Sequence, residues 1–177
     1  MNPVLLSLKP VIGNQRTLII ACHECELEEE HVDNVFFYTT LGNMLHRHDY
    51  LQQDIIRHHI EEKGCTQIIV CGHLHCGVLD HLLNDNSSRS ALTLLQFNLI
   101  KLLGDHDPKF LSAHVREQIL VELNIIQQCS LLMEYEFIRE QVAMGNLKIT
   151  GVIIGSDERA KKIYSDGFYY NNLISLN

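Results

Sequence analysis

The chain has 177 residues, of which 46% are hydrophobic and 20% charged, so it can form one domain with a sizeable core. Its formal net charge of -8 argues against nucleic-acid binding, because phosphate recognition needs clustered Lys and Arg. No apolar run approaches the roughly 20 residues that a membrane-spanning helix needs. The first residues lack a basic segment followed by a long apolar stretch, so no signal peptide is predicted.

Four short apolar runs predict β-strands. They are rich in Ile, Val, Leu or Phe and nearly continuous rather than alternating, which is typical of strands buried on both faces of a parallel sheet. In chain order they cover residues 17–21, 35–39, 67–71 and 148–154.

Helical segments are predicted between these strands, ended by glycines such as Gly64 and Gly145. Strands that alternate with helices indicate an α/β fold with a mainly parallel central β-sheet flanked by helices. The predicted helices cover residues 43–63, a short stretch from about 77, residues 88–103 and a long stretch over 112–144.

Residues 1–177 are expected to form a single domain, with 1–15 as a candidate N-terminal arm. The six cysteines are expected to be reduced thiols, because disulfides are rare in chains of this size that lack a signal peptide. The sequence therefore predicts a cytoplasmic protein.

Metal-ligating side chains follow two of the predicted strands. Cys22 comes directly after residues 17–21, and His73 and Cys76 follow 67–71. Because ligands gather at the carboxyl ends of parallel strands, we expect these side chains to meet. One cysteine alone would be interpreted as a buried structural thiol, but three ligands at matching strand ends favour a metal site. Zinc takes thiolate and imidazole in tetrahedral sites and keeps one position open in catalytic ones.

The segment 71–77, Cys-Gly-His-Leu-His-Cys-Gly, strongly resembles the C-G-H-S-x-C-G signature of β-class carbonic anhydrases. Cys22 falls where that family carries the first residue of its C-x-D-x-R motif. Weaker matches occur in the family's order. Residues 33–43 resemble the family's G-D-x-F-x-x-R-N-A-G-N segment, residues 124–128 resemble its N-V-x-x-Q helix, and residues 147–151 resemble its final strand.

The resemblance implies that Cys22, His73 and Cys76 hold zinc, and that a zinc-bound water loses a proton and attacks carbon dioxide to give bicarbonate. It also implies a homodimer or a higher homo-oligomer, in which the partner chain lines part of the substrate pocket. His75 occupies a variable position of the motif, so it is expected to be a surface or outer residue, with a proton-shuttle role left open.

The departures from the family concern the carboxylate beside the zinc. Glu24 stands in place of the family's Asp, and Glu26 in place of its Arg. In the family that Asp accepts a hydrogen bond from the zinc-bound hydroxide or ligates zinc itself. Three arrangements are considered, in decreasing order of preference. Glu24 can act as a catalytic acceptor in an open site, Glu24 can close the site as fourth ligand, or Cys25 can close it through the Cys22-x-x-Cys25 spacing.

These alternatives lead to three hypotheses of function. The first is a zinc-dependent lyase that hydrates carbon dioxide, or a relative that acts on carbonyl sulfide or carbon disulfide. The second is a zinc-binding protein of the same fold with a closed site and little or no hydratase activity. The third is a thiol-disulfide oxidoreductase using Cys22 and Cys25, which fits poorly because no proline precedes a plausible strand.

Overall fold

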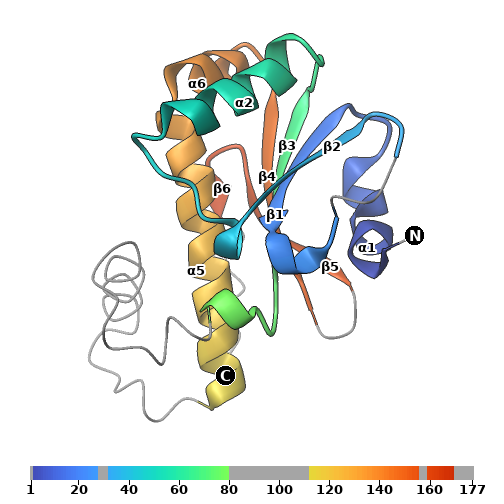
Figure 1. Cartoon of the computed structure of the whole chain (residues 1–177), viewed down its shortest axis with the longest axis vertical. Helices are drawn as coiled ribbons and strands as arrows, with labels where there is room; N and C mark the ends of the chain where they lie inside the picture. The colour runs from blue at the N-terminus through green and yellow to red at the C-terminus, as the bar shows by residue number, and fades with distance from the viewer. Residues whose placement is uncertain (1, 28–31, 80–111, 156–158, 170–177) are drawn as a thin grey trace.

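The computed structural model describes residues 2–27, 32–79, 112–155 and 159–169 (Figure 1). The helix expected over 88–103 lies outside the described residues. Within the described residues, no helix is long and apolar enough to cross a membrane.

Six strands form one sheet in the order β2-β1-β3-β4-β5-β6. The first four strands along the chain are parallel to one another, β5 pairs antiparallel with β4, and β6 pairs antiparallel with β5. The mainly parallel α/β fold is therefore confirmed. The strands are β1 (Thr17–Cys22), β2 (Val35–Thr40), β3 (Gln67–His73), β4 (Lys148–Ile154), β5 (Ala160–Ser165) and β6 (Phe168–Tyr169).

The central strands match their sequence pattern. Every residue of β1 is buried, and so is every residue of β3 except His73, because helices cover both faces of the sheet. β5 and β6 were not predicted. The first half of β5 carries the exposed Lys161 and Lys162, and only its second half is buried, so the strand lacks a continuous apolar run.

The long helix α5 (Ala113–Glu134) packs on β3 and β4, and the N-terminal helix α1 (Pro3–Ile12) lies on the other side of the sheet (Figure 1). Residues 3–12, which were expected to belong to a candidate arm, bury Leu5, Leu8 and Ile12 in the chain's own core. The organisation of the whole chain as a single domain stays a prediction.

Two predicted helix boundaries were wrong. The helix expected from residue 43 is α2 (Tyr50–Glu61), which begins later because the Asp49 side chain caps the N–H of Gln52 at 3.0 Å. Before it, the single turn η2 (Leu41–Asn43) contains positive φ angles at Gly42 and Asn43.

The helix expected over 112–144 is two helices, α5 and α6 (Glu136–Ala143). Tyr135 separates them with an extended backbone, φ -71° and ψ 119°. Its hydroxyl donates to the carbonyl oxygen of His46 at 3.3 Å, so a contact 89 residues away in the chain accompanies the break. As predicted, a short helical stretch begins at Gly77.

Candidate metal centre

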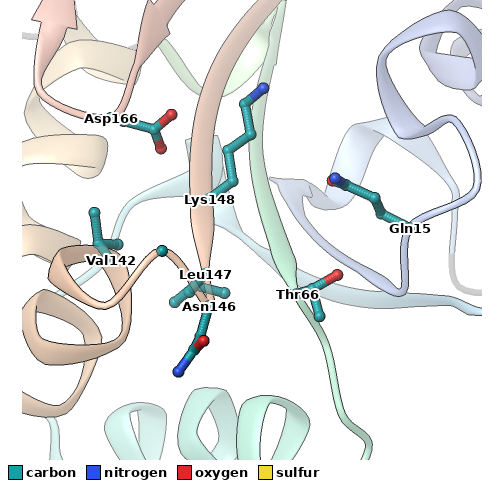
Figure 2. A pocket seen from close by; sticks show the side chains of 8 residues that line it. Gln15, Thr66, Val142, Asn146, Leu147, Lys148 and Asp166 are labelled. Atoms are coloured by element: carbon teal, nitrogen blue, oxygen red, sulfur yellow. The ribbon is translucent and has the colours of Figure 1, made fainter.

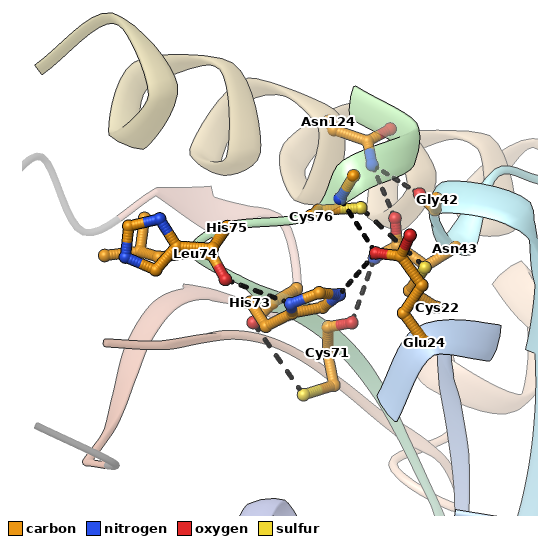
Figure 3. Close-up of polar contacts among 12 residues, drawn as sticks. Cys22, Glu24, Gly42, Asn43, Cys71, His73, Leu74, His75, Cys76 and Asn124 are labelled. Atoms are coloured by element: carbon orange, nitrogen blue, oxygen red, sulfur yellow. Dashed lines mark hydrogen bonds and ion pairs between the residues drawn. The ribbon is translucent and has the colours of Figure 1, made fainter. Parts of the chain in front are cut away.

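Four potential ligands converge at the carboxyl ends of β1 and β3. Cys22 ends β1, His73 ends β3, and Cys76 lies in the turn that follows. Glu24 lies on η1 (His23–Cys25), the single turn after β1. Since β1 and β3 are parallel neighbours, these ends lie side by side. The ligand atoms of Cys22, Glu24, His73 and Cys76 all lie within 4.8 Å of one another (Figure 3).

The distances in this cluster fit a tetrahedral metal ion. Two sulfurs bound to one zinc at about 2.3 Å with tetrahedral angles would lie about 3.8 Å apart. The Sγ atoms of Cys22 and Cys76 are 3.7 Å apart. The Nε2 atom of His73 lies 3.8 Å from Oε2 of Glu24, a separation that also allows both atoms to face one ion.

The His73 ring has one nitrogen engaged and one left for a ligand. Its Nδ1 lies 3.0 Å from the carbonyl oxygen of Leu74, which can only accept, so Nδ1 carries the hydrogen. In the neutral ring Nε2 then carries the lone pair that can bind a metal, and this atom is buried without a hydrogen-bond partner among the described residues. A buried, unpaired acceptor is costly unless something binds it, and a metal ion at this point would do so.

The charge balance of the cluster favours a cation. The hydrogen bond from Cys76 lowers the pKa of Cys22 to about 4, against the opposing effect of burial. The neighbouring His73 ring and the N–H groups of Glu24 and Gly42 also lower it. The Cys76 thiol has a raised pKa because it shares its hydrogen with Cys22 and is buried. Burial lowers the pKa of His73, but the neighbouring sulfurs of Cys22 and Cys25 outweigh it and raise it to about 10. Without a metal, a protonated His73 ring therefore faces the Cys22 thiolate at neutral pH, and a metal ion bound between them would take the place of that proton.

The Glu24 carboxylate is held by backbone rather than by a cation. Its Oε2 accepts the N–H of Gly77 at 2.8 Å, and its side chain is 39% exposed. Glu26, which stands where the family has an arginine, is exposed and has a left-handed backbone with φ 49°. In the described part of the chain, no Lys or Arg forms an ion pair with Glu24.

Two other candidates lie outside the four-residue cluster. Cys25 is buried on η1 beside His73, but its sulfur is not one of the mutually close ligand atoms. The His75 ring points away from the cluster (Figure 3) and lies with its Nδ1 3.3 Å from Oε1 of Glu117 on α5. The backbone N–H of His75 also donates to this carboxylate.

A buried polar network lies behind the cluster, and the sequence matches over 33–43 and 124–128 gave its residues no role. Asn124 donates to the carbonyl oxygen of Gly42 at 2.7 Å and accepts from Gln128 at 2.9 Å. Gln128 in turn accepts the N–H of Leu45 at 2.8 Å, and Asn43 donates to the carbonyl oxygen of Cys71 at 3.1 Å. The network ties α5 to η2 and β3. Its signal in the sequence is the pair of amides four residues apart, which one turn of a helix brings together.

A separate cavity of about 770 Å³ lies at the opposite end of the sheet (Figure 2). Lys148, which begins β4, lines it together with Asp166, Gln15 and Thr66. None of the four clustered ligands contributes to its wall, so the metal-centre chemistry does not extend to this cavity.

Comparisons with known proteins identify the family to which the chain belongs and the fold that it shares. Residues 17–159 match the family model described as carbonic anhydrase. The carbonic anhydrase of Helicobacter pylori (strain ATCC 700392 / 26695) is 30% identical over 105 residues, 54% of this chain and 47% of that protein. That of Synechocystis sp. is 26% identical over 157 residues, 81% of this chain and 57% of that protein. The chain thus spans about half the length of these relatives.

Solved structures give the same result for the fold. The β-carbonic anhydrase CafD of Aspergillus fumigatus has a TM-score of 0.68 at 21% identity, covering 86% of this chain and 91% of that one. A tetrameric β-carbonic anhydrase of Sordaria macrospora has a TM-score of 0.68 at 21% identity, covering 93% and 88%. Since the family model covers most of the residues and these folds agree, the chain belongs to the β-class carbonic anhydrase family.

Proposed function

We propose that the protein is a zinc-dependent lyase that interconverts carbon dioxide and bicarbonate, with zinc held by Cys22, His73 and Cys76. The observation that carries this proposal is the convergence of three donors at two adjacent strand ends. The two sulfurs have the 3.7 Å spacing of zinc thiolates, and the buried Nε2 of His73 has no hydrogen-bond partner in the described part of the chain.

When bound, zinc supplies a hydroxide nucleophile near neutral pH, because it lowers the pKa of water to about 7. The residues around it prepare the ligands. The carbonyl oxygen of Leu74 fixes the tautomer and the orientation of His73. Backbone N–H groups of Glu24 and Gly42 stabilise the thiolate of Cys22. The Glu24 carboxylate faces the same point, where it can accept a hydrogen bond and orient the nucleophile.

A closed site is the second candidate, and the position of Glu24 favours it. Its carboxylate oxygen belongs to the same cluster of mutually close ligand atoms as Cys22, His73 and Cys76. If Glu24 binds zinc as fourth ligand, no position remains for water, and the chain is a zinc-binding protein with little or no hydratase activity.

We further propose a cytoplasmic homo-oligomer, at least a dimer. The six cysteines are all free, which suits a reducing compartment. Leu41, Tyr50 and Leu51 are 67%, 73% and 71% exposed on η2 and the start of α2, and such apolar side chains suit an interface between copies. Light scattering coupled to size exclusion tests this, and a monomer at micromolar concentration contradicts it.

The test of the enzyme proposal combines metal analysis with stopped-flow hydration of carbon dioxide. The parent protein should carry about one zinc per chain, and Cys22→Ser and His73→Ala should lose both metal and activity. Cys25→Ser is the matched control, because it changes a neighbouring buried thiol outside the cluster and should keep both. Full zinc occupancy without hydration between roughly pH 6 and pH 9 would reject the lyase in favour of the closed site.

A further inference from the structure

The Glu24 carboxylate lies against Gly77, as a hydrogen bond and the space beside the glycine both show. The backbone N–H of Gly77 donates to Oε2 at 2.8 Å. A Cβ atom built on Gly77 would lie 2.8 Å from Oε1 of Glu24, 3.7 Å from Cδ and 3.8 Å from Oε2. The carboxylate therefore lies against the Cα of Gly77, in space that any other residue would fill with its side chain.

The backbone of Gly77 does not itself require glycine. Its φ is not positive, so an alanine can adopt the same conformation. Gly77 also opens a helical stretch, where the backbone gives glycine no advantage over alanine. A purely structural role therefore predicts that Gly77→Ala is harmless or stabilising. A role in holding Glu24 predicts a change at the metal centre instead.

The surroundings of Glu24 make this contact decisive. Glu26 offers no positive charge, and no Lys or Arg within the described residues pairs with Glu24. Among the residues that the structure describes, the partners of its carboxylate are the N–H of Gly77 and, at 3.8 Å, the ring of His73. Because Gly77 directly follows Cys76, the hydrogen bond also ties the carboxylate to the backbone that carries a ligand.

We propose that Gly77 is the positioning residue for Glu24. Its N–H holds the carboxylate beside Cys22, His73 and Cys76, and its missing side chain leaves the space in which the carboxylate sits. This inference rests on the proposed metal site. The atom displaced by alanine would be the far end of a flexible side chain, so Gly77→Ala moves Glu24 away from the cluster without unfolding the protein.

The experiment is a double-mutant cycle read in the cobalt(II)-substituted protein, whose visible absorption reports the ligands and geometry of the metal. Gly77→Ala should change the spectrum in the direction that Glu24→Ala does, and should add no further change in a Glu24→Ala background. Its thermal midpoint should equal or exceed that of the parent. Gly145→Ala is the control for the spectrum. Its φ of 74° makes alanine strained there and should lower the thermal midpoint, but nothing lies within 4 Å of its Cβ position, so the spectrum should stay unchanged.

Two outcomes would overturn the inference. One is a Gly77→Ala spectrum identical to that of the parent. The other is an equal spectral change with and without Glu24, which would mean that alanine acts by moving Cys76. Failure of the parent protein to bind cobalt(II) or zinc is a different result, since it rejects the metal site itself.

Discussion

The packing of α5 against the sheet depends on two glycines that face the same side chain. A Cβ at Gly72 on β3 would lie 2.7 Å from Cδ1 and 2.9 Å from Cγ1 of Ile125, and 2.9 Å from Cγ1 of Val121. A Cβ at Gly151 on β4 would lie 2.7 Å from Cγ2 of Ile125 and 3.0 Å from Cβ of Tyr164. We therefore expect Gly72→Ala and Gly151→Ala to force α5 away from the strands.

The size of the effect follows from these distances. Carbon atoms in contact prefer about 3.5–4.0 Å, so each added methyl overlaps its neighbours by about 1 Å in an interior with no room to give. Overpacking of this kind costs about 1–3 kcal/mol, out of a typical stability of about 5–15 kcal/mol. Urea denaturation followed by circular dichroism should show each variant with a lower midpoint than the parent.

Ile125→Ala supplies the internal check. On its own it should lower the free energy of unfolding by about 2–5 kcal/mol, because it leaves a cavity. The double variant Ile125→Ala/Gly151→Ala should lose clearly less stability than the two single variants added together, because the new methyl at position 151 enters the cavity. The coupling free energy between the two substitutions should exceed about 0.5 kcal/mol. Strict additivity, or an unchanged midpoint for either glycine variant, would refute the close-packing argument.

The two glycine variants differ in what they do to the metal centre. Gly72 precedes His73 on the same strand, whereas Gly151 lies on β4, which carries none of the clustered ligands. Gly72→Ala should therefore also weaken zinc retention against a chelator, and Gly151→Ala should not. Equal zinc loss in both variants would show that general destabilisation, not displacement of His73, releases the metal.

Further predictions concern the carboxylate, the polar network, alkaline pH and metal removal. Restoring the family's pair with Glu24→Asp and Glu26→Arg together should raise carbon dioxide hydration by about tenfold, with Glu26→Arg alone as control; no gain would contradict the role given to Glu24. Asn124→Ala should lower the free energy of unfolding by about 1–3 kcal/mol in urea, because it leaves buried groups such as the Gln128 amide unpaired; an unchanged midpoint would count against the network. Burial raises the pKa of Tyr135 from 10.0 to about 12, so its contribution to stability is complete below about pH 10 and is lost as the pH rises toward 12. Thermal midpoints across that range should fall less steeply for Tyr135→Phe, and parallel curves would refute this. Chelation of zinc should lower the thermal midpoint of the parent but not that of a variant that has lost the metal.

The parallel core was predictable because its signal is local. The strands β1, β3 and β4 are continuous apolar runs, and such runs are buried on both faces wherever they pair. Elements set by distant partners were not predictable. β5 carries the exposed Lys161 and Lys162 in its first half and is recognised only through its pairing with β4. α5 ends before Tyr135, whose hydroxyl donates to a carbonyl oxygen far away in the chain.

The candidate site divides in the same way. Cys22, His73 and Cys76 were identified from residue type and spacing, because ligands that end neighbouring parallel strands must meet at one edge of a sheet. The position of the Glu24 carboxylate could not be predicted from the sequence, since a flexible side chain on a short turn can point in several directions. Its hydrogen bond to Gly77, 53 residues later, selects one of them. Residue order along the chain thus predicted the three candidate donors, and the contact between two segments far apart in the sequence determined where the carboxylate, the fourth member of the cluster, lies.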